Sequence, residues 1–352
     1  MRSSLQSFER GEGMDQARKL ALIERANEIS LRGMGKTFPN PIVGAVIADE
    51  QGRVVSEGFH QGGPHAEVVA LANFKGDPAE ASLYLTLEPC NHHGKTGPCS
   101  EAIIKSGIRK VFYAVEDPNP IAEGGARRLR EAGIEVEKVH SDRALFFNRD
   151  WLTKISLGRA RMVWKVAHSL DGAIAAEDGT SKWITNEESR SDVKRVRDGV
   201  DAIITGTGTV LADNPTLNGK ERNPVRVVVG ERDLPSDFNI FDDSAETVHL
   251  KTRLIDEVLS FIKERGFNRV LVESGPKLGS SLFKAGLIDE LLLYQAPSIL
   301  GNGRRFTENL GISSIEDQIK LLDRGIEFFA QDLKRTLFTD NENNRRFVCS
   351  PV

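Results

Sequence analysis

The chain has 352 residues, 39% of them hydrophobic and 28% charged, which is typical of a folded protein large enough for two domains. The sequence contains no apolar run of the roughly 20 residues that cross a bilayer, and its first residues lack the apolar stretch of a secretory signal. The net charge of −4 is shared evenly between residues 1–150 and 151–352. Neither part has the basic excess that nucleic-acid binding demands, so we expect a small-molecule partner, with no nucleic acid and no membrane.

Three cysteines occur in the whole chain, and two of them, Cys90 and Cys99, lie close together. Few cysteines at a metal-like spacing suit the reducing cytoplasm and not the disulfide framework of a small secreted protein. The third, Cys349, lies beside the C-terminus and is expected to have no special role. We therefore predict a cytoplasmic protein.

Alternating helices and strands are predicted for the first part of the chain. Apolar residues recur at helical spacing over residues 15–34, and short apolar runs bounded by turn residues follow. The expected elements are a helix over 15–34, strands over 42–47 and 53–59 joined by a turn at 49–52, a helix from about His65, a strand over 82–87, a helix from Pro98 to Gly107, a strand over 110–115, a helix over 124–132 and a strand over 134–139. Residues 15–145 are thus predicted to form one α/β domain after an N-terminal extension, residues 1–14.

A connecting helix over residues 142–157 is predicted next, so that residues 146–160 link the first domain to a second α/β domain over 161–352. The expected elements of the second domain are strands over 162–167, 202–205, 225–229, 270–273 and 291–295 and helices over 186–198, 255–265 and 278–285. The turn at 206–209, and Gly275 and Gly279 after Glu273, are compatible with phosphate binding and equally with ordinary turns.

The strongest chemical signal is His65 followed by Glu67, then by Cys90 after a proline, and then by Cys99. One imidazole and two thiolates leave an open position for water on a tetrahedral Zn²⁺, which is typical of a catalytic zinc site. Glu67 is not needed as a ligand and is placed to move a proton between that water and a leaving group. This order of residues is the signature of zinc-dependent deaminases that act on nucleobase-like rings. The sequence therefore predicts zinc ligands at His65, Cys90 and Cys99 and a catalytic Glu67.

Ordinary structural roles are the alternative interpretation of these residues. A lone histidine at a helix start is more often a surface or core residue than a ligand, and buried cysteines pack as small apolar side chains. Glu67 as a solvated helix carboxylate is the corresponding alternative. The ordered occurrence of all four residues in a chain with three cysteines favours the zinc site. One irregularity stands out, because eight residues separate Cys90 from Cys99 where two are usual.

Four stretches around this motif resemble the bifunctional riboflavin-biosynthesis deaminase/reductase family: residues 39–44, 65–67, 85–99 and 116–120. The wide spacing of the two cysteines is itself a mark of that family. The resemblance implies a cytidine-deaminase-like α/β/α domain that deaminates a diaminopyrimidinone ribosylamine 5′-phosphate. The residues that it assigns to this phosphorylated pyrimidine are Asn40, His60, His92 and Lys95. An amide suits a ring edge and a lysine near a histidine suits a phosphate, although each residue alone is more often a plain loop residue.

Further stretches resemble the reductase domain of the same family: residues 169–172, 181–185, 208–215 and 272–276. The resemblance, which runs from about residue 15 to 335, implies a dihydrofolate-reductase-like α/β domain that uses NADPH to reduce the ribosyl group to ribityl. The residues that it assigns to NADPH are Ala167, Trp183, Thr209, Asp213, Gly275, Pro276 and Gly279. The residues that it assigns to the sugar-phosphate substrate are Ser181, Arg197, Leu217 and Glu273. A turn before a helix, as at 275–281, favours pyrophosphate oxygens.

Four residues depart from the family pattern in the second half. Ala173 stands where Lys or Arg is usual, His168 where a small residue is usual, Ser274 where Gly is common and Lys220 where Arg is frequent. Losing the cation at position 173 would weaken phosphate binding or the reduction. The sequence thus predicts a homo-oligomeric enzyme that catalyses consecutive deamination and NADPH-dependent reduction in riboflavin synthesis. The alternatives are a deaminase whose second half has lost catalysis and, from another class, a nucleic-acid-editing deaminase.

Overall fold

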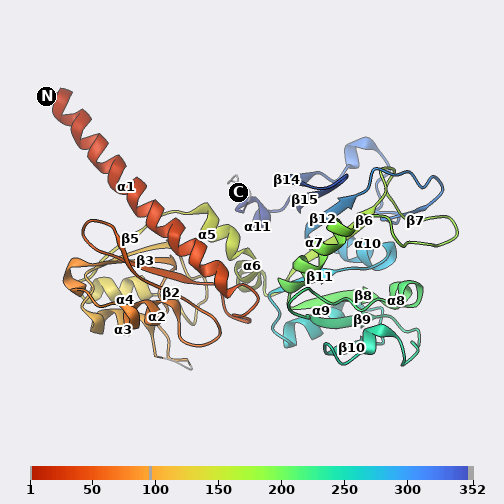
Figure 1. Cartoon of the computed structure of the whole chain (residues 1–352), viewed down its shortest axis with the longest axis horizontal. Coiled ribbons are helices and arrows are strands. Elements are labelled where there is room, and N and C mark those ends of the chain that lie inside the picture. Colours follow the sequence, from red (N-terminus) through yellow and green to blue (C-terminus); the bar gives the residue numbers. More distant parts are fainter. Residues whose placement is uncertain (1, 95–96, 348–352) are drawn as a thin grey trace. The chain divides into compact units, whose positions relative to one another are not determined.

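The computed structural model describes residues 2–94 and 97–347, with side chains from Asp15 onward (Figure 1). The chain divides into two compact units between Ser156 and Leu157. Each unit has its own sheet and its own hydrophobic core. No helix within the described ranges combines the length and the apolar composition that crossing a bilayer requires.

The first unit contains a five-stranded sheet in the order β2-β1-β3-β4-β5. Its strands are β1 (Gly44–Ala48), β2 (Val54–Phe59), β3 (Ser82–Leu87), β4 (Lys110–Val115) and β5 (Glu135–Lys138). Its helices are α1 (Arg2–Ser30), α2 (Ala66–Asn73), α3 (Cys99–Ser106), α4 (Gly125–Glu131), α5 (Asp142–Phe147) and α6 (Arg149–Leu157), with 3₁₀ turns at Leu31–Gly33 and Pro78–Glu80. Strand β1 pairs antiparallel with β2 and β3, whereas β3, β4 and β5 run parallel.

Side chains alternate across this sheet, so both of its faces need covering by helices. Ala45 and Ile47 of β1 join a core that contains residues of α2, α3 and α4. Val46, between them, is equally buried on the opposite face, where α1 packs against β1, β3 and β4. On that face the ammonium group of Lys19 lies 5.1 Å from the centre of the Phe112 ring. The predicted α/β/α arrangement of the first domain is confirmed.

Most predicted elements of the first unit are present in the predicted order, and the strands at Ser82–Leu87 and Lys110–Val115 have the predicted bounds. The predicted hairpin turn is also present, because the Gly52 N–H donates to the Asp49 carbonyl at 2.8 Å and Gly52 has a φ of +70°. The first helix, however, begins at Arg2 and ends at Ser30 rather than running over 15–34.

The single helix predicted over residues 142–157 is wrong, because Asn148 separates α5 from α6. The buried Asn148 side chain accepts a hydrogen bond from the Ile42 N–H and donates one to the Ile42 carbonyl, both at 3.0 Å. Asparagine readily bonds to backbone groups in place of continuing a helix. Its partner is more than a hundred residues away in sequence, so the helical periodicity of the segment gives no sign of the break.

The second unit contains an eight-stranded sheet in the order β10-β9-β8-β11-β6-β12-β15-β14 and a small sheet of β13 and β7. Its strands are β6 (Arg161–His168), β7 (Ala173–Ala175), β8 (Ala202–Gly206), β9 (Val225–Val229), β10 (Thr247–Leu250), β11 (Arg269–Val272), β12 (Ile288–Gln295), β13 (Arg304–Arg305), β14 (Leu321–Phe329) and β15 (Asp332–Thr339). Its helices are α7 (Glu187–Asp198), α8 (Thr207–Asp213), α9 (Ile255–Glu264), α10 (Pro276–Lys284) and α11 (Glu342–Arg345), with 3₁₀ turns at Asn239–Phe241 and Ile315–Asp317.

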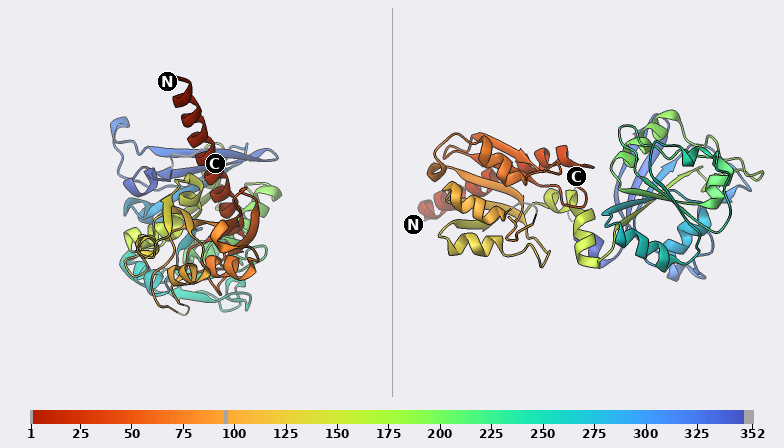
Figure 2. Two further views of the ribbon diagram at one scale, coloured as in Figure 1. Left: turned by 90° about the vertical axis from the view of Figure 1, so that its left-hand side faces the viewer. Right: turned by 90° about the horizontal axis from the view of Figure 1, so that it is seen from below.

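The six strands from β10 to β12 are parallel, and β15 and β14 close one edge as an antiparallel hairpin. Parallel strands need helices on both faces of the sheet. Trp164 of β6 belongs to the core shared with α9 and α10, whereas its neighbour Val163 belongs to the core shared with α7 and α8. Figure 2 shows the strands of this unit enclosed by helices. The predicted second α/β domain is confirmed.

Several elements near the C-terminus are absent from the sequence prediction, among them the hairpin of β14 and β15. The pairing of β14 shifts register between Asp323 and Gly325, and Gly325 has a φ of +129°. Beyond this irregularity Ile326 and Phe328 are exposed. A strand is recognised in a sequence by the alternation of apolar and polar residues. The bulge interrupts this alternation, and the exposed apolar residues blur it further, so the pattern does not predict the strand.

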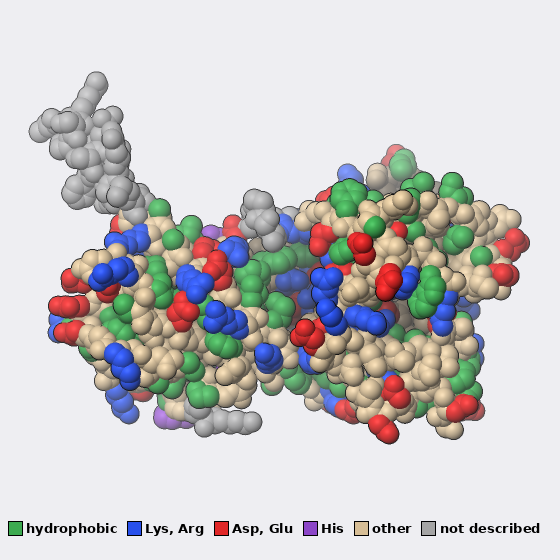
Figure 3. Space-filling model, viewed as in Figure 1, with side chains coloured by type: hydrophobic (Ala, Val, Ile, Leu, Met, Phe, Trp, Pro, Cys, Tyr) green, Lys and Arg blue, Asp and Glu red, His purple; other side chains and the backbone are tan. Residues whose placement is uncertain are grey.

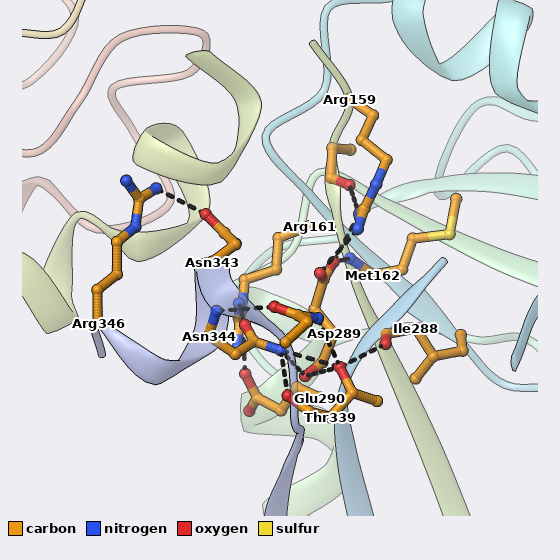
Figure 4. Close-up of polar contacts among 12 residues, drawn as sticks. Arg159, Arg161, Met162, Ile288, Asp289, Glu290, Thr339, Asn343, Asn344 and Arg346 are labelled. Atoms are coloured by element: carbon orange, nitrogen blue, oxygen red, sulfur yellow. Dashed lines mark hydrogen bonds and ion pairs between the residues drawn. The ribbon is translucent and has the colours of Figure 1, made fainter. Parts of the chain in front are cut away.

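Buried polar contacts fix the end of this hairpin to the sheet, as Figure 4 shows. The side-chain carbonyl of Asn344 accepts a hydrogen bond from Arg161 at 2.6 Å, and its amide donates to the Asp289 carbonyl and the Thr339 hydroxyl, both at 2.9 Å. The Asp289 carboxylate accepts two hydrogen bonds from Arg159, at 2.7 and 2.9 Å. Because these side chains are paired, the buried charges at this end of the sheet are compensated.

Candidate functional site

His65, Cys90 and Cys99 meet in the first unit with their ligand atoms all within 4.8 Å of one another. The Nδ1 atom of His65 lies 3.2 Å from the sulfur of Cys99 and 3.5 Å from the sulfur of Cys90. A tetrahedral ion with bonds of about 2.0–2.3 Å holds its ligand atoms roughly 3.5 Å apart. The donor set and its spacing therefore fit Zn²⁺ with one further coordination position.

Three elements place these ligands. His65 is the N-cap residue of α2, Cys90 follows β3, and Cys99 is the first residue of α3. Gly58 of β2 lets α2 approach closely, because a Cβ atom there would lie 2.3 Å from the Ala66 carbonyl oxygen. Cys99 thus brings the chain back to the metal site at a helix start, where the dipole favours a thiolate.

The two thiols interact strongly, so each shifts the pKa of the other. The hydrogen bond from Cys99 lowers the pKa of Cys90 to about 4, aided by His65 and opposed by burial. The same hydrogen bond, together with burial, raises the pKa of Cys99. A single proton can satisfy only one of two adjacent thiolates, whereas a divalent cation satisfies both.

Glu67 lies in the first turn of α2 and is buried beside the ligands. Burial raises the pKa of Glu67 to about 7. A carboxyl group that titrates near neutral pH can accept a proton in one step and release it in the next. Its position and protonation suit an acid–base role and not that of a solvated helix carboxylate.

A cavity of about 150 Å³ adjoins this cluster. The described residues that line it are Asn40, Pro41, Val43, His60, His65, Glu67, Leu87, Glu88, Cys90, His92, Asp117, Asn119, Ala122 and Trp151. Three of the four predicted pyrimidine contacts, Asn40, His60 and His92, thus lie at one cavity with the metal ligands. The fourth, Lys95, lies outside the described residues, as does Cys349.

The two histidines of the cavity differ in their hydrogen bonds. The Nδ1 atom of His60 lies 3.1 Å from the Pro64 carbonyl, which can only accept, so Nδ1 carries the proton and Nε2 accepts from the Asn40 amide at 3.3 Å. Burial lowers the pKa of His60, which favours this neutral form. The buried Nδ1 atom of His92 has no hydrogen-bond partner among the described residues and is available to a ligand.

Two residues of the cavity region received no role from the sequence. Glu88 is buried and accepts hydrogen bonds from the Ala126 N–H at 2.9 Å and the Asp117 N–H at 3.3 Å, so it joins the loop after β4 to the start of α4. Its position directly before Pro89 and the metal ligand Cys90 is the feature of the sequence that could have indicated a role for Glu88. Trp151 on α6 received no role because its segment was predicted to be a plain connecting helix.

A second cavity of about 740 Å³ lies in the second unit, at the carboxyl ends of β6, β8 and β11. Ligands of open parallel sheets bind at this end of the strands. The predicted residues that line it are Ala167, Ser181, Trp183, Arg197, Thr209, Asp213, Leu217, Glu273 and Gly275. Tertiary structure thus brings together side chains that span more than a hundred positions of the sequence.

Glu273 is buried in this cavity between two cations. Arg197 donates hydrogen bonds to it at 2.6 and 3.0 Å, and Lys165 donates one at 3.4 Å. Burial by itself raises the pKa of Glu273, but the two cations outweigh this effect and lower the pKa to about 2. Lys165 received no role from the sequence, although a lysine inside the apolar strand predicted at 162–167 is a visible signal.

Other polar contacts order the rim of the second cavity. Ser181 donates to the Asp213 carboxylate at 2.6 Å, and the Gly275 N–H donates to the Thr209 hydroxyl at 3.1 Å. Trp183 is 71% exposed, and the guanidinium group of Arg190 lies 4.5 Å from the centre of its ring. An exposed indole at the mouth of a cavity offers a flat apolar surface to a ligand.

Two of the predicted NADPH contacts do not line the cavity. Pro276 and Gly279 are buried within α10. A Cβ atom at Gly279 would lie 2.2 Å from the Trp164 ring, so glycine is needed there for close packing of α10 on β6. The structure therefore accounts for Gly279 by helix packing.

The departures from the family pattern are compatible with anion binding. Ala173 is fully buried in β7, away from the cavity lining, and its N–H donates to the Ser169 hydroxyl at 3.0 Å. His168 is buried against Phe306, with 5.6 Å between the ring centres. Ser274 does line the cavity. The cations that line the cavity are Lys165, Lys182, Arg190, Lys194 and Arg197. Positive charge is thus supplied without a cation at position 173.

Comparisons with known proteins cover both units. Residues 17–115 match the family described as cytidine and deoxycytidylate deaminase zinc-binding region, and residues 160–334 match the RibD C-terminal domain. The riboflavin biosynthesis protein RibD of Mycobacterium tuberculosis (strain H37Rv) is 41% identical over 342 residues, which cover 94% of this chain and 99% of that protein. RibD of Escherichia coli (strain K12) is 35% identical over 343 residues, which cover 85% and 92%.

Solved structures with the same organisation are also similar. A diaminohydroxyphosphoribosylaminopyrimidine deaminase/5-amino-6-(5-phosphoribosylamino)uracil reductase from Thermotoga maritima has a TM-score of 0.86 and 32% identity, covering 92% of this chain and 99% of that chain. RibD of Acinetobacter baumannii has a TM-score of 0.85 and 34% identity, with the same coverage.

These similarities extend along both units and confirm the cytidine-deaminase-like first domain and the reductase fold of the second. They also agree with the His/Cys/Cys cluster in the first cavity. The chain therefore belongs to the RibD family of riboflavin biosynthesis, bifunctional enzymes with a zinc-binding deaminase domain followed by a reductase domain that uses NADPH.

Proposed function

We propose that this enzyme deaminates 2,5-diamino-6-(5-phosphoribosylamino)pyrimidin-4(3H)-one and then reduces the ribosyl group, yielding 5-amino-6-(5-phosphoribitylamino)uracil. The observation that carries the first step is the cluster of His65, Cys90 and Cys99 with Glu67 at the wall of one cavity. The name of the similar Thermotoga maritima enzyme supports the same pyrimidine substrates.

We assign the deaminase to residues 15–145 and the reductase to residues 161–352, with 146–160 as the link and 1–14 as an N-terminal extension. The matches over 17–115 and 160–334 and the division of the chain between Ser156 and Leu157 support this assignment.

In the deaminase, His65, Cys90 and Cys99 would hold the zinc ion. When bound, zinc supplies a nucleophile at neutral pH by acidifying water. Glu67 would accept one proton of the attacking water and deliver it to the ring nitrogen. It would then take the second proton from the newly bound hydroxyl group and pass it to the departing amino group. The water oxygen thus forms the new bond to the ring carbon, the carbon–nitrogen bond breaks, and ammonia leaves. The pKa of Glu67 near 7 matches this two-way proton transfer.

The remaining groups of this cavity orient the substrate. Because His60 accepts a hydrogen bond from the Asn40 amide group, the Asn40 carbonyl oxygen is left to accept one from the pyrimidine edge. His92 offers the same substrate its Nδ1 atom, which has no hydrogen-bond partner among the described residues. We assign the phosphate contact to Lys95, which lies between the two cysteines in the sequence.

In the reductase, NADPH when bound supplies the two electrons for opening the ribosyl ring. The residues that we assign to NADPH are Ala167, Trp183, Thr209, Asp213 and Gly275. Pro276 and Gly279, which the sequence also indicated, are buried in α10, and we assign them to the packing of that helix beside the cavity. The residues that we assign to the sugar-phosphate substrate are Ser181, Arg197, Leu217 and Glu273. The cations of the cavity support binding of two phosphorylated ligands.

We further assign the enzyme to the cytoplasm as a homo-oligomer that acts on a small phosphorylated pyrimidine. Strand β14, at the edge of the eight-stranded sheet, exposes Ile326 and Phe328, which supports self-association. On the face drawn in Figure 3, Lys and Arg side chains alternate with Asp and Glu rather than forming a basic stripe. This pattern favours a small substrate over nucleic acid.

The test uses the purified full chain. We expect about one zinc ion per chain, ammonia release from the diaminopyrimidinone, and NADPH oxidation only after that deamination. Ammonia release without NADPH oxidation would favour the deaminase-only alternative. If the zinc-loaded protein shows neither ammonia release nor NADPH oxidation, the proposed substrate is refuted. Sedimentation measures the oligomeric state.

A further inference from the structure

Trp151 occupies an unexpected place at the deaminase cavity. It lies on α6, in the segment that the sequence predicts to be a plain connecting helix. The side chain is 6% exposed, and it lines the same cavity as His65, Glu67 and Cys90. Segment α5–α6 therefore completes the first unit's site.

Two contacts fix α6 against the loop that leads into β1. Asn148, just before α6, forms its two hydrogen bonds with Ile42. One turn beyond Trp151, the ammonium group of Lys154 lies 5.9 Å from the centre of the Phe38 ring. Asn148, Trp151 and Lys154 are spaced by three residues, which places them near one face of the helix. Trp151 thus faces the loop of residues 38–42, which carries Asn40.

The chemistry of the cavity gives Trp151 a distinct role. Trp151 is the only Phe, Tyr or Trp among the described residues that line the cavity. The other walls consist of hydrogen-bonding and metal-binding groups, with small apolar side chains such as Val43 and Ala122. Enzymes that act on nucleobase-like rings hold the ring between aromatic or apolar side chains while polar groups contact its edge.

We infer that Trp151 contacts the face of the pyrimidine ring and contributes to the selection of the substrate. The inference rests on the proposed deaminase function. Asn148 acts as a positioning residue, because the helix break and its bonds to Ile42 aim the start of α6 at the cavity. Trp151 takes no part in proton transfer, so its contribution belongs to substrate binding.

Kinetics of ammonia release from zinc-loaded full-length enzyme test the inference. For Trp151→Ala we expect the KM for the diaminopyrimidinone to rise about tenfold, as loss of one aromatic contact implies. Trp151→Phe keeps an aromatic face and should change KM by less than about threefold. Phe147→Ala is the matched control, since Phe147 belongs to the same segment but does not line the cavity. Its KM should match that of the wild type.

A binding measurement provides a readout without turnover. In a Glu67→Gln background, tryptophan emission is followed as the diaminopyrimidinone is added, with and without Trp151→Phe. We expect part of the emission change to disappear with Trp151, while any contribution from Trp183 in the second unit stays in both proteins. If Trp151→Ala fails to fold, this comparison still shows whether Trp151 contacts the bound pyrimidine.

An unchanged KM in zinc-loaded Trp151→Ala, or identical emission changes with and without Trp151, would overturn the inference. Failure of the proposed function looks different, because wild-type enzyme would then release no ammonia from this pyrimidine.

Discussion

Arg197 and Glu273 form a two-point ion pair in the second cavity, with Nε donating to Oε1 at 2.6 Å and Nη2 donating to Oε2 at 3.0 Å. Lys165 adds a third contact to the same carboxylate at 3.4 Å. All three side chains are largely withdrawn from solvent. The Glu273 carboxylate therefore holds Arg197 and Lys165 in place. It also neutralises part of the positive charge that binds a phosphorylated ligand.

Replacing Glu273 by Gln should destabilise the second unit. The substitution leaves Arg197 and Lys165 in a buried position without their acidic partner, which costs about 3 kcal/mol of the free energy of unfolding. Urea unfolding measures this loss, and NADPH oxidation should fall with it. Ammonia release is the internal control and should persist, because Glu273 does not line the deaminase cavity. An unchanged unfolding free energy would contradict the prediction.

The low pKa of the same carboxylate predicts that the free energy of unfolding depends on pH in the acid range. Although burial raises the pKa of Glu273, the two cations lower it to about 2, below the ordinary value of 4.5. Its contribution of about 3 kcal/mol is therefore fully present above about pH 5 and is lost as the pH falls toward 2. Unfolding of the wild type between pH 3 and 6 should show this loss. In Glu273→Gln the slope should be smaller, and equal slopes would exclude Glu273 as its source.

Glu67→Gln should separate metal binding from catalysis. The variant keeps His65, Cys90 and Cys99, so we expect its zinc content to equal that of the wild type. Ammonia release should fall at least about a hundredfold, the usual contribution of a positioned acid–base group. Metal analysis and an ammonia assay on the same preparation check both statements. A normal rate of ammonia release would refute the proton-transfer role.

Two glycine substitutions distinguish packing from cofactor binding. Gly279→Ala places a methyl group against the buried Trp164 ring and should lower the free energy of unfolding by about 2 kcal/mol. Gly275→Ala meets only the Thr209 hydroxyl, at 3.8 Å, and should leave stability unchanged. Because Gly275 lines the cavity, this second variant should instead raise the KM for NADPH. A reversed pattern of effects would show that the two assignments are exchanged.

Ala173→Lys tests whether this chain lacks a necessary cation. Ala173 is fully buried, and a Cβ atom at Gly303 would lie only 2.8 Å from its side chain, so a lysine has no space there. We expect a loss of about 2 kcal/mol in stability and no gain in NADPH oxidation. Lys220→Arg, at an exposed position, serves as a control with unchanged stability. Faster NADPH oxidation by Ala173→Lys would instead show that the cation is missing.

The sequence by itself determined the α/β class of both domains, most of their parallel strands and the zinc motif. Local signals suffice in these cases. Buried strands such as Val225–Val229 are continuous apolar runs, and the order of His65, Glu67, Cys90 and Cys99 needs no knowledge of distant contacts.

Tertiary structure alone decided features that depend on partners far along the chain. Asn148 breaks the predicted connecting helix because it bonds to Ile42, and this break directs Trp151 into the deaminase cavity. Lys165 acquires its place only when Arg197 and Glu273 meet at the carboxyl ends of parallel strands. The physical reason is the same in each case: periodicity reports which face of an element is apolar, whereas a long-range hydrogen bond or ion pair leaves no periodic trace.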